Sequence, residues 1–263
     1  MVTIKISERI IQSIVMVDTN IIYNEDCFVG MKEIPDKSVN LILTDLPYGL
    51  TAAKWDKYID IDKLWNEYKR IITDDGVILL FGQEPFSSKL RLSNLEMYRY
   101  DIIWKKQKPS NFQLMNYQMG RVTENICVFS KAKACYTTNK ISMRYNPQLV
   151  KRDKPRTANV KIYGKANLLH AYKTSDNFKT YEYRQPINVV EFKTVTKNKT
   201  HPTEKPVPLL EYLIKTFSNE NDIVLDTCMG TGSTCIAAKN TLRRYIGFEI
   251  NEKYFEIAKK RLE

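Results

Sequence analysis

The stretch TDLPYG at positions 44–49 combines an acid, a rigid turn and an aromatic ring directly after a short apolar run. The run predicts a buried strand, so the stretch would lie where that strand ends. There the carboxylate of Asp45 and the carbonyl of Leu46 can each accept a hydrogen bond from an exocyclic amine. Pro47 stiffens the turn and Tyr48 can stack on a flat base. The same residue types also form ordinary turns, so both interpretations stay open for this stretch alone.

A second candidate site is the glycine-rich stretch LDTCMGTGST at positions 225–234. A strand ends, glycines form a tight turn and a helix begins, which lets a ligand approach the backbone at the carboxyl end of a strand. Asp226 is expected at the strand tip. Glu249 follows about 20 residues later, a spacing at which an acid commonly accepts hydrogen bonds from ribose hydroxyls. Position 235 is Cys, so the full dinucleotide pattern with a third glycine is absent.

A third stretch, HPTEKP at positions 201–206, leads into a predicted helix. The start of a helix favours an anion, and Lys205 adds a positive charge there. This arrangement could receive the carboxylate of an amino-acid-like cofactor. A capped helix start with a surface histidine, His201, is the plainer interpretation.

The elements that must position these stretches alternate between strands and helices. Apolar spacing predicts a helix over 60–72, with Asp60 as its cap and the sequence DDG at 74–76 as its end. Further strands are predicted over 39–44, 77–81, 102–104, 126–129, 223–225 and 245–248, and further helices over 206–217, 231–240 and 251–262. This alternation predicts an α/β fold with a doubly wound, mostly parallel, Rossmann-like sheet.

A basic block interrupts this alternation at residues 131–200. The block holds 16 Lys and Arg against 4 Asp and Glu, whereas the rest of the chain has 25 basic and 26 acidic residues. Six tyrosines are interleaved with these cations, and this combination suits a polyanion whose bases can stack. The block therefore predicts an inserted nucleic-acid-binding module. Its expected nucleic-acid contacts, which the resemblance given below implies are contacts to DNA, are Lys151, Arg152, Lys154, Arg156, Lys161 and Lys165.

Composition narrows the class of protein further. The five cysteines include no C-x-x-C pair and there are only two histidines, which argues against a disulfide framework and against a metal site. No apolar run approaches the roughly 20 residues that cross a bilayer. The first 18 residues mix charges into their apolar stretch, which is atypical of a secretory signal. These features predict a cytoplasmic protein without membrane association.

The three stretches, in this order and with a basic block after the first, resemble the β-class of S-adenosylmethionine-dependent DNA amino-methyltransferases. That family has an Asp-Pro-Pro-Tyr catalytic motif, a target-recognition region, a His-Pro-Thr-x-Lys-Pro stretch and a glycine-rich cofactor loop. The corresponding positions here are 45–48, 131–200, 201–206 and 226–234, and the segment NEDC at 24–27 is similar to the entry segment of the family. The resemblance covers roughly residues 20–130 and 200–262.

The resemblance implies roles for these residues. Asp45 and the Leu46 carbonyl would orient the target amine, Tyr48 would stack on a flipped base, and the loop 49–56 would close over it. The methyl group would move directly from S-adenosylmethionine to the nitrogen, without a covalent enzyme intermediate. Cofactor-binding roles are implied for Asp26, Cys27, Asp45, Thr203, Lys205, Asp226, Cys228, Gly230, Gly232, Ser233, Thr234 and Glu249.

The resemblance also implies a domain organisation. Residues 20–130 would form the catalytic half of a methyltransferase domain, residues 131–200 the target-recognition insert, and residues 201–263 the cofactor-binding half. Residues 1–19 have no assignment. Double-stranded DNA is the expected partner, and a homodimer and a cognate restriction endonuclease are possible further partners.

Three functions remain open at this point. Asp at position 45 favours adenine N6 as the target, since cytosine-N4 enzymes of the family often carry Ser there. A cytosine-N4 enzyme with the same fold is the first alternative. The second is a non-catalytic DNA-binding protein, because Leu46 replaces the first proline of the family motif and Cys228 stands where the family usually has Phe.

Overall fold

The structure is a computed structural model that describes residues 18–49, 59–135, 141–163, 172–196, 199–201 and 203–263. The chain divides into two compact units. The larger contains Met1–Asn146 and Asn188–Glu263, and the smaller contains Pro147–Ile187. The smaller unit is thus narrower than the insert expected over 131–200, because the segments flanking it belong to the larger unit. Residues 1–19 received no assignment from the sequence, and of these the structure describes only positions 18 and 19.

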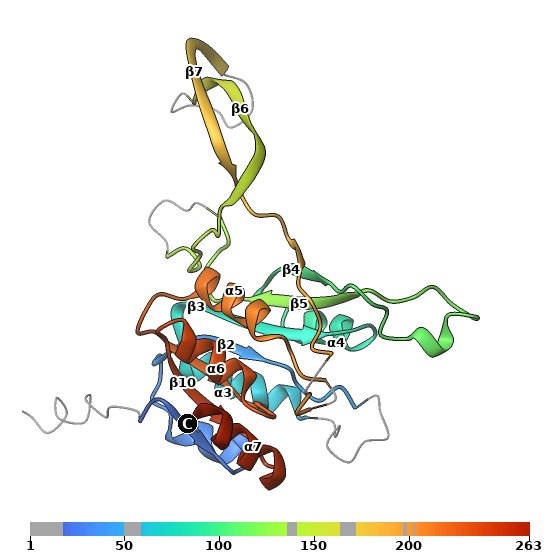
Figure 1. The fold of residues 1–263 in the computed structure, drawn as a ribbon. Coiled ribbons are helices and arrows are strands. Elements are labelled where there is room, and N and C mark those ends of the chain that lie inside the picture. Colours follow the sequence, from blue (N-terminus) through green and yellow to red (C-terminus); the bar gives the residue numbers. More distant parts are fainter. Residues whose placement is uncertain (1–17, 50–58, 136–140, 164–171, 197–198, 202) are drawn as a thin grey trace, which may run out of the picture. The chain divides into compact units, whose positions relative to one another are not determined.

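The larger unit is built on a mixed sheet with the strand order β1-β10-β9-β2-β3-β5-β4-β8 (Figure 1). Among the described strands of this sheet, only β5 runs antiparallel to its neighbours β3 and β4, so the predicted mostly parallel sheet is confirmed. The strands are β1 (Ile21–Tyr23), β2 (Val39–Thr44), β3 (Ile72–Gly82), β4 (Tyr98–Lys105), β5 (Thr123–Phe129), β8 (Val189–Glu191), β9 (Ile223–Asp226) and β10 (Arg244–Phe248).

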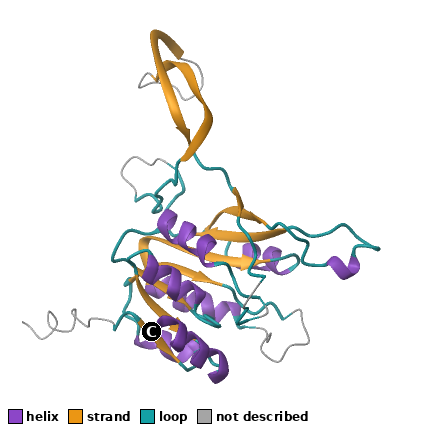
Figure 2. Ribbon diagram, in the orientation of Figure 1, coloured by secondary structure: helices purple, strands orange, loops and turns teal. Residues whose placement is uncertain are grey.

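Helices cover both faces of this sheet (Figure 2). The α-helices are α2 (Cys27–Gly30), α3 (Ile61–Ile71), α4 (Phe86–Ser93), α5 (Val207–Phe217), α6 (Ser233–Asn240) and α7 (Glu252–Leu262), and the 3-10 helices are η1 (Met31–Glu33) and η2 (Phe112–Leu114). Helices α5, α6 and α7 pack on one face together with Leu41 and Leu43, and α2, α3 and α4 pack on the other together with Ile42. Successive residues of a strand point to opposite faces, so the continuous apolar run of β2 supplies both cores.

The predicted cap of α3 and its predicted extent are confirmed, but the sequence DDG at 74–76 does not form the turn expected to end the helix. The Asp60 side chain accepts a hydrogen bond from the backbone N–H of Lys63 at 3.1 Å, which satisfies a donor that the first turn leaves unpaired. At the other end, β3 begins at Ile72 without an intervening turn. The pairing register with β2 shifts after Val39–Ile72 and resumes at Leu41–Val77, so the sequence DDG at 74–76 lies in an irregularity within β3.

The smaller unit is an antiparallel hairpin of β6 (Val150–Tyr163) and β7 (Tyr172–Arg184). The pairing places Lys151 opposite Tyr183 and Arg156 opposite Tyr181. Residues directly opposite each other share a face of the ribbon, so cations and aromatic rings alternate on one face. Lys179 adds to this pattern, with Nζ 5.7 Å from the centroid of the Tyr181 ring.

Candidate functional site

The candidate residues gather at the carboxyl edge of the parallel strands, around β2 and β9. The chain continues from β2 to β3 on one side of this pair and from β9 to β10 on the other. Such a reversal of strand order opens a crevice at the carboxyl ends, where α/β proteins bind their ligands. Asp45 follows the end of β2 and Asp226 ends β9.

Asp45 lies in a cluster of five polar groups, most of them buried. Its Oδ1 accepts a hydrogen bond from the Tyr48 hydroxyl at 2.8 Å, and its Oδ2 is ion-paired with Nζ of Lys205. Lys205 Nζ also lies 3.1 Å from Oε1 of Glu124, whose other oxygen is 2.5 Å from Nζ of Lys106. Two carboxylates and two ammonium groups therefore alternate in a chain that ends at Asp45.

Burial and charge pairing compete in setting the ionisation of this cluster. Burial raises the pKa of Asp45, and the nearby charge of Lys205 acts in the opposite direction. Burial also opposes the ionisation of Glu124, but Lys205 and Lys106 outweigh it and hold its pKa below the ordinary value. The two carboxylates raise the pKa of Lys205 despite its burial. Lys205 is thus the cation that opposes protonation of the buried Asp45 carboxylate.

The residues next to Asp45 fix its orientation. Leu46 is buried in the core beneath the sheet edge, so the residue that replaces the family proline is anchored by packing. The Tyr48 ring stacks on Phe86, with centroids 4.7 Å apart and planes at 27°. A base stacked on Tyr48 would therefore use the ring face opposite Phe86. Pro47 is half-buried, and most of the loop expected to close over the base, positions 50–58, lies outside the described residues.

Asp226 is the centre of a second cluster on the neighbouring strand. Its buried carboxylate accepts hydrogen bonds from the backbone N–H of Cys228 at 3.1 Å and from the hydroxyls of Thr44 and Thr234. Burial raises its pKa to about 6, with these hydrogen bonds acting in the opposite direction. A buried carboxylate with no cation among these partners is suited to receive a positively charged ligand group.

The glycine loop leaves space at this point. Gly230 and Gly232 have φ of +54° and +79°, a left-handed backbone that side chains disfavour. A Cβ added to Gly230 would meet no atom within 4 Å, so the backbone here borders open space. Glu249 accepts hydrogen bonds from the backbone N–H groups of Gly230 (2.9 Å) and Asn251 (2.8 Å). Each of its oxygens keeps capacity for a further donor, such as a hydroxyl.

Of the other predicted cofactor residues, some lie next to the glycine loop and others contact neither cluster through their hydrogen bonds to described residues. The Cys27 thiol is within hydrogen-bond reach of Cys228, which connects the segment after β1 to the glycine loop. Asp26 is exposed and caps α2, accepting from the backbone N–H of Phe28 at 2.8 Å. Thr203 is exposed, and its hydroxyl and backbone N–H lie 3.1 and 3.2 Å from Nδ1 of His201. Thr203 is therefore not in contact with either cluster through these bonds.

Sequence reasoning missed several polar residues at this edge. Glu124 and Lys106 belong to the Asp45 cluster, and the only signal for Glu124 was an acid two residues before a buried apolar run. Glu204 and Arg261 form a second pair at 2.9 Å. This pair contacts the hydroxyl of Ser233, the first residue of α6, at 3.4 Å from each partner. It therefore ties the segment before α5 to the helix that follows the glycine loop.

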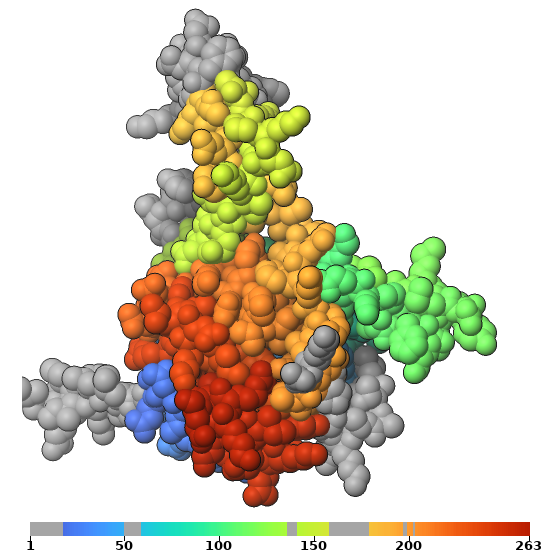
Figure 3. All heavy atoms as spheres, in the orientation of Figure 1, coloured from blue at the N-terminus to red at the C-terminus, as the bar shows by residue number. Residues whose placement is uncertain are grey.

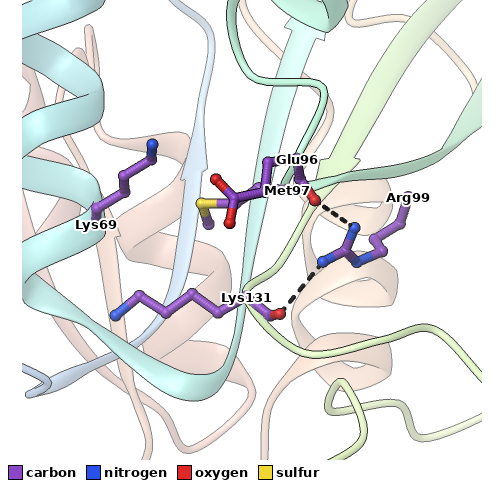
Figure 4. Close-up of a pocket in the computed structure, with 5 residues that line it drawn as sticks. All are labelled: Lys69, Glu96, Met97, Arg99 and Lys131. Carbon is purple, nitrogen blue, oxygen red and sulfur yellow. Dashed lines mark hydrogen bonds between the residues drawn. The ribbon is translucent and has the colours of Figure 1, made fainter.

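A separate pocket of about 270 Å³ lies away from these clusters (Figure 4). It is lined by Lys69, Glu96, Met97, Arg99 and Lys131. The lysine at position 131 donates to the backbone carbonyl of Ile72, where β3 begins. The pocket is thus at the amino end of β3, opposite to the edge that carries Asp45.

The predicted DNA-binding residues lie in the smaller unit. Lys151, Lys154 and Arg156 are exposed on β6, and Arg152, partly exposed, donates to the Tyr183 carbonyl at 3.3 Å. Lys161 lies on β6, and the structure does not describe its side chain; Lys165 lies outside the described residues. Across the described part of the chain, no helix has the length and apolar character needed to span a bilayer.

Comparison with known proteins identifies the family. The model of the DNA methylase family N6_N4_Mtase matches residues 39–260. The Escherichia coli (strain K12) protein YubD is 52% identical over 255 residues, which cover 90% of this chain and 87% of YubD. DNA adenine methyltransferase YhdJ from the same organism is 27% identical over 259 residues, covering 92% of this chain and 82% of YhdJ. The chain belongs to this family of S-adenosylmethionine-dependent DNA amino-methyltransferases, as its motifs indicated.

Solved structures show the same fold. The complex of M1.HpyAVI with SAM is 24% identical, with a TM-score of 0.58, and the match covers 91% of this chain and 98% of that one. The cytosine-N4-specific PvuII DNA methyltransferase is 14% identical, with a TM-score of 0.66, and the match covers 94% of this chain and 87% of that one. At these identities the likeness supports the fold alone.

Proposed function

We propose that this protein transfers a methyl group from S-adenosylmethionine to the N6 amine of an adenine flipped out of duplex DNA. The observation that carries the proposal is the Asp45 carboxylate at the sheet edge, held between the Tyr48 hydroxyl and the Lys205 ammonium. Adenine is favoured by Asp at position 45 and by the similarity to an enzyme named as an adenine methyltransferase. Cytosine N4 is the alternative target within the same family.

The Asp226 cluster fits the proposed cofactor. Its buried carboxylate would face the cationic amine of the methionine part, and the open space at Gly230 would admit that part close to the backbone. Glu249 would accept hydrogen bonds from the ribose hydroxyls. When bound, the cofactor supplies an electrophilic methyl group on sulfur.

The Asp45 cluster would make the target amine a better nucleophile. An aromatic amine is a weak nucleophile because its lone pair is delocalised into the ring. Asp45 and the Leu46 carbonyl would each accept one of its hydrogen atoms, which favours a pyramidal nitrogen whose lone pair points away from the protein acceptors. Tyr48 and Lys205 already occupy one site on each Asp45 oxygen, so the amine would use a remaining lone pair. Alignment and fixed charges would then supply most of the rate.

The smaller unit would bind the DNA. A two-stranded ribbon fits the major groove, and the face that carries Lys151, Arg156, Tyr181 and Tyr183 offers cations to phosphates and rings to bases. We also propose a cytoplasmic location, where the protein would meet DNA. Several relatives are named Type II methyltransferases, so we also propose a restriction-modification setting with a cognate endonuclease. A homodimer is part of the proposal.

The test incubates the purified protein with S-adenosylmethionine labelled in its methyl group and with unmethylated genomic DNA. The DNA is then digested to nucleosides and separated by chromatography. Label in N6-methyl-2′-deoxyadenosine supports the proposal, and label in N4-methyl-2′-deoxycytidine replaces it with the cytosine alternative. Asp45→Ala should abolish transfer while cofactor binding, measured by calorimetry, stays within a few-fold. Absence of transfer by a wild type that binds both DNA and cofactor would favour a non-catalytic DNA-binding protein.

A further inference from the structure

Residues 106–122 form an arm that joins β4 to β5 and extends from the larger unit (green in Figure 3). Its tip exposes large apolar side chains, with Phe112 69%, Tyr117 88% and Met119 93% exposed, and Leu114 and Met115 about half exposed. Contiguous apolar exposure of this kind marks an interaction surface. The sequence of the arm contains three basic residues and no acidic residue.

Internal hydrogen bonds give the arm a defined shape. The backbone N–H of Lys106 donates to the Val122 carbonyl at 2.6 Å, which closes its base. Further along, Asn111 bridges the two sides. Its Oδ1 accepts from the backbone N–H of Arg121 at 2.6 Å, and its Nδ2 donates to the Met119 carbonyl at 3.2 Å. Exposed apolar residues are therefore presented by an ordered element, which lowers the entropic cost of using them in binding.

The base of the arm is part of the Asp45 cluster. Lys106, its first residue, is ion-paired with Glu124, two residues beyond its end. Glu124 in turn contacts Lys205 at 3.1 Å and the Tyr48 hydroxyl at 3.5 Å. The arm thus starts and ends next to the groups proposed to hold the flipped base.

We propose that the arm inserts its apolar tip into the duplex beside the flipped adenine and occupies the space that the base leaves in the stack. Flipping a base costs a few kcal/mol of lost stacking and pairing, and apolar side chains wedged between base steps are a known way to hold an opened stack. The cations of the arm, Lys108 and Arg121, match the flanking phosphates. A second copy of the same acid-free surface would instead meet like charge, so DNA is the favoured occupant. The inference rests on the function proposed above.

The experiment uses duplex oligonucleotides that contain a site methylated by the wild-type protein, located by sequencing methylated genomic DNA. One duplex is fully paired, and the other has an abasic residue opposite the target base, which reduces the cost of flipping. The tested variant is Tyr117→Ser/Met119→Ser. The control is Leu92→Ser, which removes an exposed apolar side chain (71% exposed) from α4, outside the arm. The measured quantity is kcat/KM for methyl transfer to each duplex, with sedimentation velocity in parallel.

The arm variant should lower the ratio of kcat/KM for paired DNA to kcat/KM for abasic DNA by roughly tenfold or more. A tenfold change corresponds to about 1.4 kcal/mol of activation free energy that the arm would contribute by filling the opened stack. Leu92→Ser should keep the wild-type ratio. Activity of the arm variant on abasic DNA also shows that it is folded. An unchanged ratio overturns the inference. An equal loss on both duplexes together with a changed sedimentation coefficient also overturns it and makes the arm a contact between copies. A wild type that methylates neither duplex nor genomic DNA refutes the proposed function itself, and the inference with it.

Discussion

Lys205→Met removes the ammonium group that the Asp45 cluster shares while keeping a side chain of similar length. In the wild type, Lys205 Nζ is ion-paired with Asp45 and lies 3.1 Å from Glu124 Oε1. After the substitution Glu124 still has Lys106 as a partner at 2.5 Å, but Asp45 keeps only the Tyr48 hydroxyl among these contacts. Burial already raises the pKa of Asp45, so loss of the cation raises it further.

The magnitude follows from Coulomb's law. Two unit charges about 4 Å apart interact by about 4 kcal/mol at an effective dielectric constant of about 20. A factor of ten in the protonation equilibrium of a group corresponds to about 1.4 kcal/mol. Losing the interaction with Lys205 therefore shifts the protonation equilibrium of Asp45 toward the protonated form by roughly two to three orders of magnitude. A protonated carboxyl group is a poorer acceptor for the target amine. We therefore expect methyl transfer near neutral pH to fall by roughly tenfold or more.

The assay measures kcat for methyl transfer to DNA at saturating cofactor, from about pH 6 to about pH 9, for the wild type and the variant. The deficit should be largest at the acidic end and should shrink as the pH rises, because Asp45 then loses its proton without help from a cation. Lys131→Met is the matched control, since Lys131 is also partly buried beside a carboxylate, 3.9 Å from Asp74, but lies at the opposite edge of the sheet.

Two results would refute this reasoning. A variant with wild-type activity at all pH values would show that Asp45 does not depend on Lys205. A deficit of constant size across the pH range would show that Lys205 acts through folding or cofactor binding instead. Urea denaturation of the variant separates these cases, because a folding defect would appear as a lower midpoint.

Further predictions concern the cofactor cluster and the hairpin. Asp226 has a folded pKa of about 6, above its ordinary value, so the stability linked to its proton is present below about pH 4 and lost as the pH rises through 6. The unfolding free energy of Asp226→Asn relative to wild type should thus grow by about 3 kcal/mol between about pH 4 and pH 7 in urea titrations; a constant difference would contradict the assignment. Gly232→Ala should lower the free energy of unfolding by more than about 1 kcal/mol, because its φ of +79° is strained for alanine and the new Cβ would lie 3.0 Å from a side chain of α7. Gly230→Ala, with open space around the new Cβ, should cost only the backbone strain, and equal costs would rule out the steric contribution. Lys151→Ser/Arg152→Ser should lower the slope of log K for DNA against log salt by about 2, as measured by fluorescence anisotropy, and an unchanged slope would place the interface elsewhere.

The sequence by itself determined the class of the fold and the place of its motifs. Apolar runs of strand length alternate with helical spacing, and each motif follows a strand, so the carboxyl edge of a parallel sheet was predictable. Local capping was predictable too, because Asp60 and Asn251 act on N–H groups only three residues away. The motif order indicated the family that the family model then matched over residues 39–260.

The tertiary structure alone decided which charged groups meet. Lys205 was expected near a cofactor carboxylate but pairs with Asp45, 160 positions away in the chain. Glu124 joins them because β5 runs antiparallel to β3, which places its first residues at the edge where the parallel strands end. Strand direction within the sheet is set by long-range packing and cannot be read from a short apolar run. The same limit explains the continuation of β3 through the DDG sequence, where pairing with β2 overrides a local turn preference. It also explains why the apolar arm became recognisable only once the fold showed that its side chains are exposed, since apolar residues in a sequence are otherwise expected to be buried.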